Sequence, residues 1–211
     1  VGRLAGSSYA FPGKVAEHHS IDAYTKYEQI HNKIEHAKHT LVIGGGSVGI
    51  ELCGEIATDF KDKHITLVHT QSCLLHPNVF NSQMYKRIQS QLEDLSVKII
   101  LNEKVDVQQY FNGNELNYII GERMYETNKK TQITADLTFL CTGTKINNKS
   151  LNSTFKQHFN SEGRLNVNNY LQVDGYKNIF AIGDISSKES KMAFLAGRQA
   201  EFVAKLIPLI Q

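Results

Sequence analysis

Apolar residues along the first two thirds of the chain follow two alternating spacings. Short runs rich in aliphatic and β-branched residues stand at 41–43, 64–69, 97–101 and 137–140. Between them, residues 48–60 and 80–95 carry an apolar side chain about every fourth position. The first pattern is typical of buried strands and the second of helices with one apolar face. Their order predicts an α/β fold, a doubly wound, Rossmann-like parallel sheet with right-handed crossovers.

The remaining segments carry weaker patterns. Residues 21–38 place Ile21, Tyr24, Ile30 and Ile34 among polar neighbours, which predicts an amphipathic helix. Short alternating runs over 104–134, with turn signals at 112–113 and 128–130, predict an antiparallel β-meander inserted before the strand at 137–140. Towards the end of the chain we expect three short strands at 164–167, 171–173 and 178–182, and a helix from Met192 to Leu206.

A glycine-rich turn follows the first predicted strand directly. Gly44, Gly46 and Gly49 satisfy the G-x-G-x-x-G pattern of a dinucleotide-binding βαβ unit. The first glycine permits a tight turn, the second lets the backbone approach a pyrophosphate, and the third lets the helix pack close to the strand. We expect the pyrophosphate at the helix N-terminus, beside Gly45 and Ser47 as well, because unsatisfied N–H groups there attract anions. The alternative is an ordinary strand-to-helix turn.

Two residues near this turn are candidates for contacts with a nicotinamide nucleotide. His69 stands where an NAD site usually places an acidic residue for the ribose 2′-hydroxyl. Its replacement by His69-Thr70-Gln71 predicts that NADPH is accepted, alongside NADH; alternatively, His69 only caps a strand. Glu51, on the first turn of the helix, is the candidate catalytic residue at the nicotinamide, or else a partner of the helix dipole.

Three further positions have the chemistry of a cofactor site. Gly143 follows the strand at 137–140 and permits close approach of a ligand at the edge of the sheet. Gly183 and Asp184 end another apolar run, where a carboxylate could accept hydrogen bonds from a sugar or ribityl hydroxyl. The alternative is an ordinary turn at the end of a strand. Lys191 and Met192 open the last helix, whose N–H groups can face an electron-rich ring, although Lys191 can equally be a solvated charge.

Composition narrows the class of protein. The net charge of +2 argues against nucleic-acid binding driven by electrostatics, and no apolar run approaches the ~20 residues of a membrane span. Cys53, Cys73 and Cys141 form neither a C-x-x-C pair nor a zinc spacing, so we predict no metal site and a reducing, cytoplasmic setting.

Taken in order, five motifs resemble the pyridine-nucleotide-dependent flavoprotein oxidoreductases, and within them the apoptosis-inducing factor 2 / ferroptosis suppressor group. They stand at 42–51, 66–69, 140–147, 179–184 and 191–197. The resemblance implies FAD as fixed cofactor, hydride delivery from NAD(P)H to the flavin, and electron transfer to a quinone-like or other small-molecule acceptor. It also implies that Asp184 binds the ribityl or phosphate region of FAD and that Glu51 lies where nicotinamide meets flavin.

The resemblance also implies a division of the chain. Residues 1–38 would end the N-terminal segment of an FAD domain, 39–143 would form the NAD(P)H domain, and 144–211 the second half of the FAD domain. Such flavoproteins carry another glycine motif near the N-terminus, and this chain has one in all. We therefore expect a partial sequence or a short form of the enzyme, with peripheral membrane association of a full-length parent. The alternative is a truncated, non-catalytic NAD(P)H-binding module or interaction protein.

Overall fold

The computed structural model describes residues 19–75, 81–110, 118–143 and 146–209. These residues divide into two compact units, one ending at Gly143 and the other comprising the residues that follow. Phe80, the first apolar residue of the second predicted helix, and the expected turn at 112–113 lie outside the described residues.

A five-stranded sheet forms the centre of the first unit, with the strand order β3-β2-β1-β5-β4. The strands are β1 (His39–Ile43), β2 (His64–Val68), β3 (Lys98–Ile100), β4 (Tyr118–Glu126) and β5 (Gln132–Leu140). β1 pairs in parallel with both β2 and β5, and β2 pairs in parallel with β3. Only β4 is antiparallel to its neighbour, β5. The predicted doubly wound, Rossmann-like fold is therefore confirmed.

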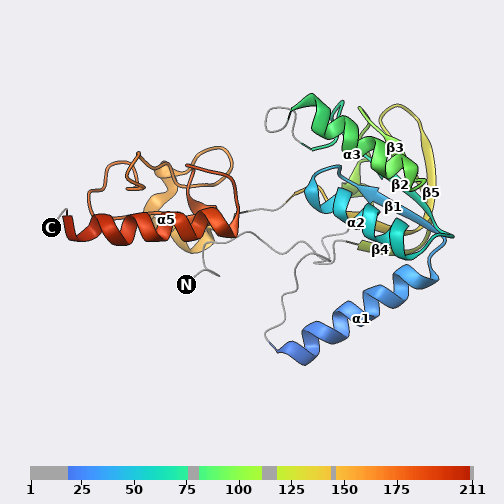
Figure 1. The fold of residues 1–211 in the computed structure, drawn as a ribbon, viewed down its shortest axis with the longest axis horizontal. Coiled ribbons are helices and arrows are strands. Elements are labelled where there is room, and N and C mark those ends of the chain that lie inside the picture. The colour runs from blue at the N-terminus through green and yellow to red at the C-terminus, as the bar shows by residue number, and fades with distance from the viewer. Residues whose placement is uncertain (1–18, 76–80, 111–117, 144–145, 210–211) are drawn as a thin grey trace. The chain divides into compact units, whose positions relative to one another are not determined.

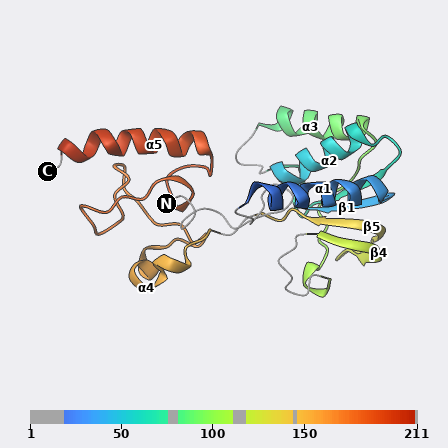
Figure 2. The same ribbon diagram turned by 90° about the horizontal axis from the view of Figure 1, so that it is seen from below.

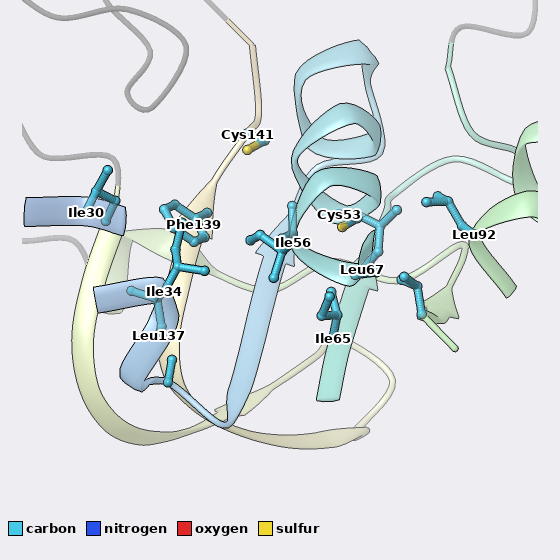
Figure 3. Close-up of a cluster of buried hydrophobic side chains, with 14 of the residues drawn as sticks. Ile30, Ile34, Cys53, Ile56, Ile65, Leu67, Leu92, Leu137, Phe139 and Cys141 are labelled. Atoms are coloured by element: carbon cyan, nitrogen blue, oxygen red, sulfur yellow. The ribbon is translucent and has the colours of Figure 1, made fainter. Parts of the chain in front are cut away.

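Three helices cover one face of this sheet (Figures 1 and 2): α1 (Ser20–His36), α2 (Ser47–Asp59) and α3 (Ser82–Asp94). Figure 3 shows Ile30 and Ile34 of α1 beside Phe139 of β5, in the apolar cluster beneath these helices. The amphipathic helix predicted at 21–38 is confirmed, but only its second half packs. Ile21 and Tyr24 are 77% and 63% exposed.

The β4–β5 hairpin supplies the core on the other face of the sheet. Tyr125, Ile133 and Ala135 pack against Leu41 and Ile43 of β1. The antiparallel insertion predicted before residues 137–140 is confirmed as the β4–β5 hairpin, to which Val105 adds a single bridge at Thr127. Its second strand differs in extent, because β5 begins at residue 132 instead of 137. The early half of β5 pairs with β4 alone, and its later half also pairs with β1. The turn predicted at 128–130 is confirmed.

The second unit contains two α-helices among its described residues, α4 (Asn152–Phe155) and α5 (Ala193–Leu206). The three strands predicted here are wrong: the described residues form isolated bridges, such as the one between Val167 and Val173. A turn explains this, because the side chain of Asn168 accepts hydrogen bonds from the main-chain N–H groups of Tyr170 and Gln172. Such local bonding competes with a strand ladder.

Short 3₁₀ turns complete both units. They are η1 (Val107–Gln109), η2 (Lys149–Leu151), η3 (Lys156–His158), η4 (Gly183–Ile185) and η5 (Ile207–Leu209). The core of the second unit gathers Leu165, Val173, Ala181 and Ile185. Within the described ranges, no helix is both long and apolar enough to cross a membrane.

Candidate nucleotide-binding site

The glycine turn joins β1 to α2 at the carboxyl edge of the parallel sheet. The N–H of Gly44 donates to the carbonyl of Val68, at the end of β2, over 2.8 Å. The N–H of Cys141, at the end of β5, donates to the carbonyl of Ile43 over 2.7 Å. The turn thus lies between β2 and β5, where the strand order reverses. In open α/β sheets this is the place where ligands bind.

The glycines of this turn serve different purposes. Gly44 has φ +117°, and a Cβ built there would lie 2.3 Å from the carbonyl oxygen of Cys141. A Cβ on Gly49 would lie 1.9 Å from the carbonyl oxygen of Gly44. Gly46 differs, because its φ of −79° suits any residue and its Cβ would meet no atom within 4 Å. Packing requires Gly44 and Gly49, whereas Gly46 keeps a space open in front of α2, as a bound pyrophosphate requires.

The N-terminus of α2 has the features of an anion-binding site. Gly46 is its N-cap and provides no side-chain cap, and the first turn carries no acidic residue. Ser47 and Val48 are exposed. N–H groups at such a helix start bind phosphate oxygens, and the helix dipole adds to the attraction. The turn therefore fits the pyrophosphate that its sequence predicts.

Glu51 lies farther along the helix than expected. Because α2 begins at Ser47, Glu51 is its fifth residue, and the prediction that it stands on the first turn is wrong. The effect of the helix dipole falls off beyond that turn, which removes support for Glu51 as a dipole partner. The side chain is exposed. Its contact with nicotinamide stays a prediction.

His69 contacts the glycine turn itself. Its Nδ1 accepts a hydrogen bond from the N–H of Gly45 over 3.1 Å, and its Nε2 is buried with no hydrogen-bond partner among the described residues. The ring lies so close that a Cβ on Gly45 would be 2.9 Å from its Cγ. Burial lowers the pKa of the ring, and a smaller interaction with the main chain of Leu75 raises it in part. The ring is therefore neutral near pH 7.

Gly143 reaches the same edge of the sheet from β5. Its φ is +105°, and a Cβ there would meet no atom within 4 Å. Gly143 is exposed, whereas Cys141 is buried in the core under the helices (Figure 3). The structure thus brings Gly143 to the edge that carries the glycine turn, with open space beside both Gly143 and Gly46.

The second unit holds the other predicted cofactor residues. Gly183, with φ +71°, opens η4, and Asp184 follows it half-buried. Lys191 and Met192 are exposed, and Met192 is the N-cap of α5 without a side-chain cap. Sequence reasoning missed Gln199, whose Oε1 accepts a hydrogen bond of 2.7 Å from the N–H of Gly183. The signal was a polar residue within the apolar stripe of the last helix.

In the part of the chain that the structure describes, no three His, Cys, Asp or Glu side chains are grouped to hold a metal ion. The sheet, the open glycine turn and its place at the switch point define a dinucleotide-binding α/β protein. The model of the pyridine nucleotide-disulphide oxidoreductase family matches residues 5–200. The chain belongs to this family, whose members are NAD(P)H-dependent flavin oxidoreductases that bind FAD and NAD(P)H.

Known relatives agree with the resemblance seen in the sequence. Ferroptosis suppressor protein 1 of Homo sapiens is 35% identical over 205 residues, which are 96% of this chain and 54% of that protein. Apoptosis-inducing factor homolog A of Dictyostelium discoideum is 32% identical over 198 residues, 88% of this chain and 48% of that protein. The chain spans about half the length of these relatives.

Solved structures share the fold at lower identity. The water-forming NADH oxidase of Lactobacillus brevis bound to NADH superposes with a TM-score of 0.66 at 22% identity, covering 95% of this chain and 44% of the oxidase. Reduced CoADR-RHD of Bacillus anthracis gives 0.66 at 21% identity, covering 96% of this chain and 36% of that protein. These likenesses support the fold.

Proposed function

We propose that this chain binds NAD(P)H at the glycine turn and serves an FAD-dependent oxidoreductase that passes hydride from NAD(P)H to flavin. The open space at Gly46 carries the proposal, because it is a cradle that packing does not require. Electrons would then pass to a quinone-like or other small-molecule acceptor. The names of the relatives, ferroptosis suppressor and apoptosis-inducing factor homolog, support this placement within the family.

The two units of the chain would bind different cofactors. In the first unit, the turn from Gly44 to Gly49 would hold the pyrophosphate, with Gly143 beside it and Glu51 towards the nicotinamide. In the second, Gly183 and Asp184 would hold FAD, with Lys191 and Met192 at the start of α5. Bound FAD would supply the hydride acceptor and the means of passing electrons on.

The proposed domain boundaries follow the same resemblance. Residues 39–143 form the NAD(P)H domain and 144–211 the second half of the FAD domain, with 1–38 before them. Ile30 and Ile34 of α1 nevertheless share the core of the first unit, so α1 supports the NAD(P)H domain. A cytoplasmic setting, and peripheral membrane association of a longer parent, complete the proposal.

A pair of glycine variants on one helix tests the nucleotide site. Gly46→Ala adds a methyl group to the open cradle without strain, since φ there is −79°. Gly54→Ala is the matched control, since a Cβ there would only touch Leu92 at 4.0 Å. Calorimetry with NADPH and NADH should show at least about tenfold weaker binding for Gly46→Ala, about 1.4 kcal/mol, and no change for Gly54→Ala. Unchanged affinity in Gly46→Ala, and in the bulkier Gly46→Trp, would reject the site.

The flavin part of the proposal has its own measurement. The full chain is mixed with FAD, freed of excess, and its flavin absorbance is read before and after NADPH is added. Retained flavin that bleaches supports the oxidoreductase. Protection by NADPH against thermal unfolding without retained flavin would instead support the non-catalytic NAD(P)H-binding module for this chain.

A further inference from the structure

One side chain, that of His69, contacts the glycine turn at Gly45. Gly45 is held on both sides of its peptide: its N–H donates to His69 Nδ1 over 3.1 Å, and its carbonyl accepts from the N–H of Leu75 over 2.8 Å. The side chain of Leu74, fully buried, lies against the same residue, since a Cβ on Gly45 would be 2.8 Å from its Cδ2. His69 therefore contributes the one side-chain hydrogen bond that the structure gives to Gly45 among the described residues.

This hydrogen bond fixes the proton of the ring. A neutral imidazole has one donor nitrogen and one acceptor nitrogen. Since Nδ1 accepts from Gly45, the proton of the neutral ring is on Nε2, which is buried. Nε2 is buried and Nδ1 is engaged as an acceptor, so in this position neither nitrogen is free to donate to a ribose 2′-phosphate.

We propose that His69 is a positioning residue for the dinucleotide pyrophosphate: its neutral ring holds the glycine turn in the anion-binding shape, and a second proton on the ring releases that turn. The inference rests on the proposed function, because it concerns the same nucleotide site. Protonation at Nδ1 would make it a donor, so that two N–H groups, one on Nδ1 and one on the main chain of Gly45, would face each other without an acceptor. The turn must then shift, and the N–H groups at the start of α2 lose their alignment on the pyrophosphate.

The charged groups around His69 do not offset the effect of ring protonation on the glycine turn. On the loop after β3, the N–H of Glu103 donates to the carbonyl of His69 over 3.1 Å, but its carboxylate accepts from Thr127 Oγ1 over 2.6 Å. Lys104 follows on that loop, and Cys73 is titratable in the described part of the loop after β2, residues 69–75. The glycine turn itself carries no ionisable side chain. Among the described residues, a proton gained by the ring would therefore have no carboxylate paired with it.

The prediction separates this role from direct phosphate binding. A histidine that contacts the ligand phosphate would strengthen binding when it becomes cationic. A histidine that positions Gly45 would weaken it. The two roles thus predict opposite slopes of affinity against pH, and a structural role alone predicts none.

The test measures ADP-ribose binding to the full chain by calorimetry between about pH 8 and about pH 5, where an imidazole changes charge. ADP-ribose carries the pyrophosphate but neither nicotinamide nor a 2′-phosphate, so the ligand adds no titration in this range. We expect affinity to fall by about tenfold towards acid pH, because a fall of this size corresponds to the loss of one hydrogen-bonded contact. Binding that stays constant or strengthens would overturn the inference and leave the proposed function standing. No binding at pH 8 would overturn both.

Three variants complete the design. His69→Asn places an amide oxygen near the position of Nδ1, so it should bind as the wild type does near pH 8 and keep that affinity in acid. His69→Leu removes the acceptor and should bind weakly at all pH values. His64→Asn, at the other end of β2, is the matched control and should follow the wild type. An acid loss of equal size in His69→Asn would reject the role of His69.

A spectroscopic measurement checks the premise without a ligand. Imidazole ¹⁵N shifts of His69 in the free chain should show the tautomer protonated at Nε2. The amide of Gly45 should lose its hydrogen-exchange protection in acid in the wild type but keep it in His69→Asn. A tautomer protonated at Nδ1 would contradict the hydrogen bond on which the inference depends.

Discussion

The side-chain oxygen of Gln199, on α5, accepts a hydrogen bond of 2.7 Å from the main-chain N–H of Gly183. The orientation of this amide is fixed at its other end, where Nε2 donates to the Glu189 carboxylate over 2.7 Å. Arg164 in turn donates to the main-chain carbonyl of Glu189. Gln199 is only 6% exposed. The turn that carries Asp184 is thus tied to α5 by a chain of polar contacts.

Replacing Gln199 by leucine should loosen this turn. The variant leaves the N–H of Gly183 without its acceptor in a partly buried position, which costs about 1–3 kcal/mol. Hydrogen exchange at the Gly183 amide should be faster, and the unfolding transition of the second unit should move to lower denaturant concentration. Glu201→Gln, an exposed change on the same helix, should leave both unchanged. Normal protection of Gly183 in Gln199→Leu would argue against this contact.

Lys63 ties the end of α1 to the sheet. Its Nζ donates to the carbonyls of Glu35 over 2.8 Å and Ala37 over 2.7 Å, and it lies 4.9 Å from the centre of the Phe60 ring. A cation at a helix C-terminus interacts favourably with the helix dipole. Because Lys63 is only 9% exposed, water cannot easily replace it at those carbonyls.

We expect Lys63→Met to lower the free energy of unfolding by about 2–4 kcal/mol, since two carbonyls lose a charged donor. Denaturant unfolding of the variant and of Lys61→Met, an exposed lysine nearby, makes the comparison. Equal midpoints for the two variants would show that the helix end is stabilised by its apolar contacts instead.

The parallel core of the first unit was predictable because its strands are buried on both faces. Runs such as Leu41-Val42-Ile43 must therefore be apolar throughout, and they are easily recognised. β5 was only half recognised, because its first residues alternate between exposed and buried in the hairpin, whereas 137–139 are buried without a break. The turns of the second unit depend on local side-chain bonds such as that of Asn168, which hydrophobic spacing does not reveal.

The site was predictable in position but not in detail. The spacing of Gly44, Gly46 and Gly49 indicated the turn, because two of the three are demanded by close backbone contacts. Spacing also placed His69 beside it, but not the direction of its ring. That direction depends on the contact with Gly45, which precedes His69 by 24 residues and which the fold brings against the ring. Gln199 was missed for the same reason.

The three cysteines should differ in reactivity. Cys53 and Cys141 are buried, whereas Cys73 is half-buried. Burial raises the pKa of the Cys53 thiol, and it raises that of Cys141 to about 12. Since the thiolate is the reactive form, a thiol reagent near pH 8 should modify one cysteine in the native chain and all three after denaturation. Mass mapping should assign the native label to Cys73. Rapid native labelling of Cys53 would show that the helix-covered core opens readily.

The same burial predicts a loss of stability at alkaline pH. In the unfolded chain the thiols ionise near their ordinary pKa of 9.0, but Cys141 holds its proton until about pH 12. Above pH ~9 the native state therefore binds more protons than the unfolded state, and the free energy of unfolding falls by at most about 1.4 kcal/mol per pH unit for each such thiol. Cys141→Ala should remove one thiol's share of this slope. Ile43→Val, a core truncation without an ionisable group, should lower stability but keep the slope. Equal slopes in the wild type and in Cys141→Ala would contradict the burial of this thiol.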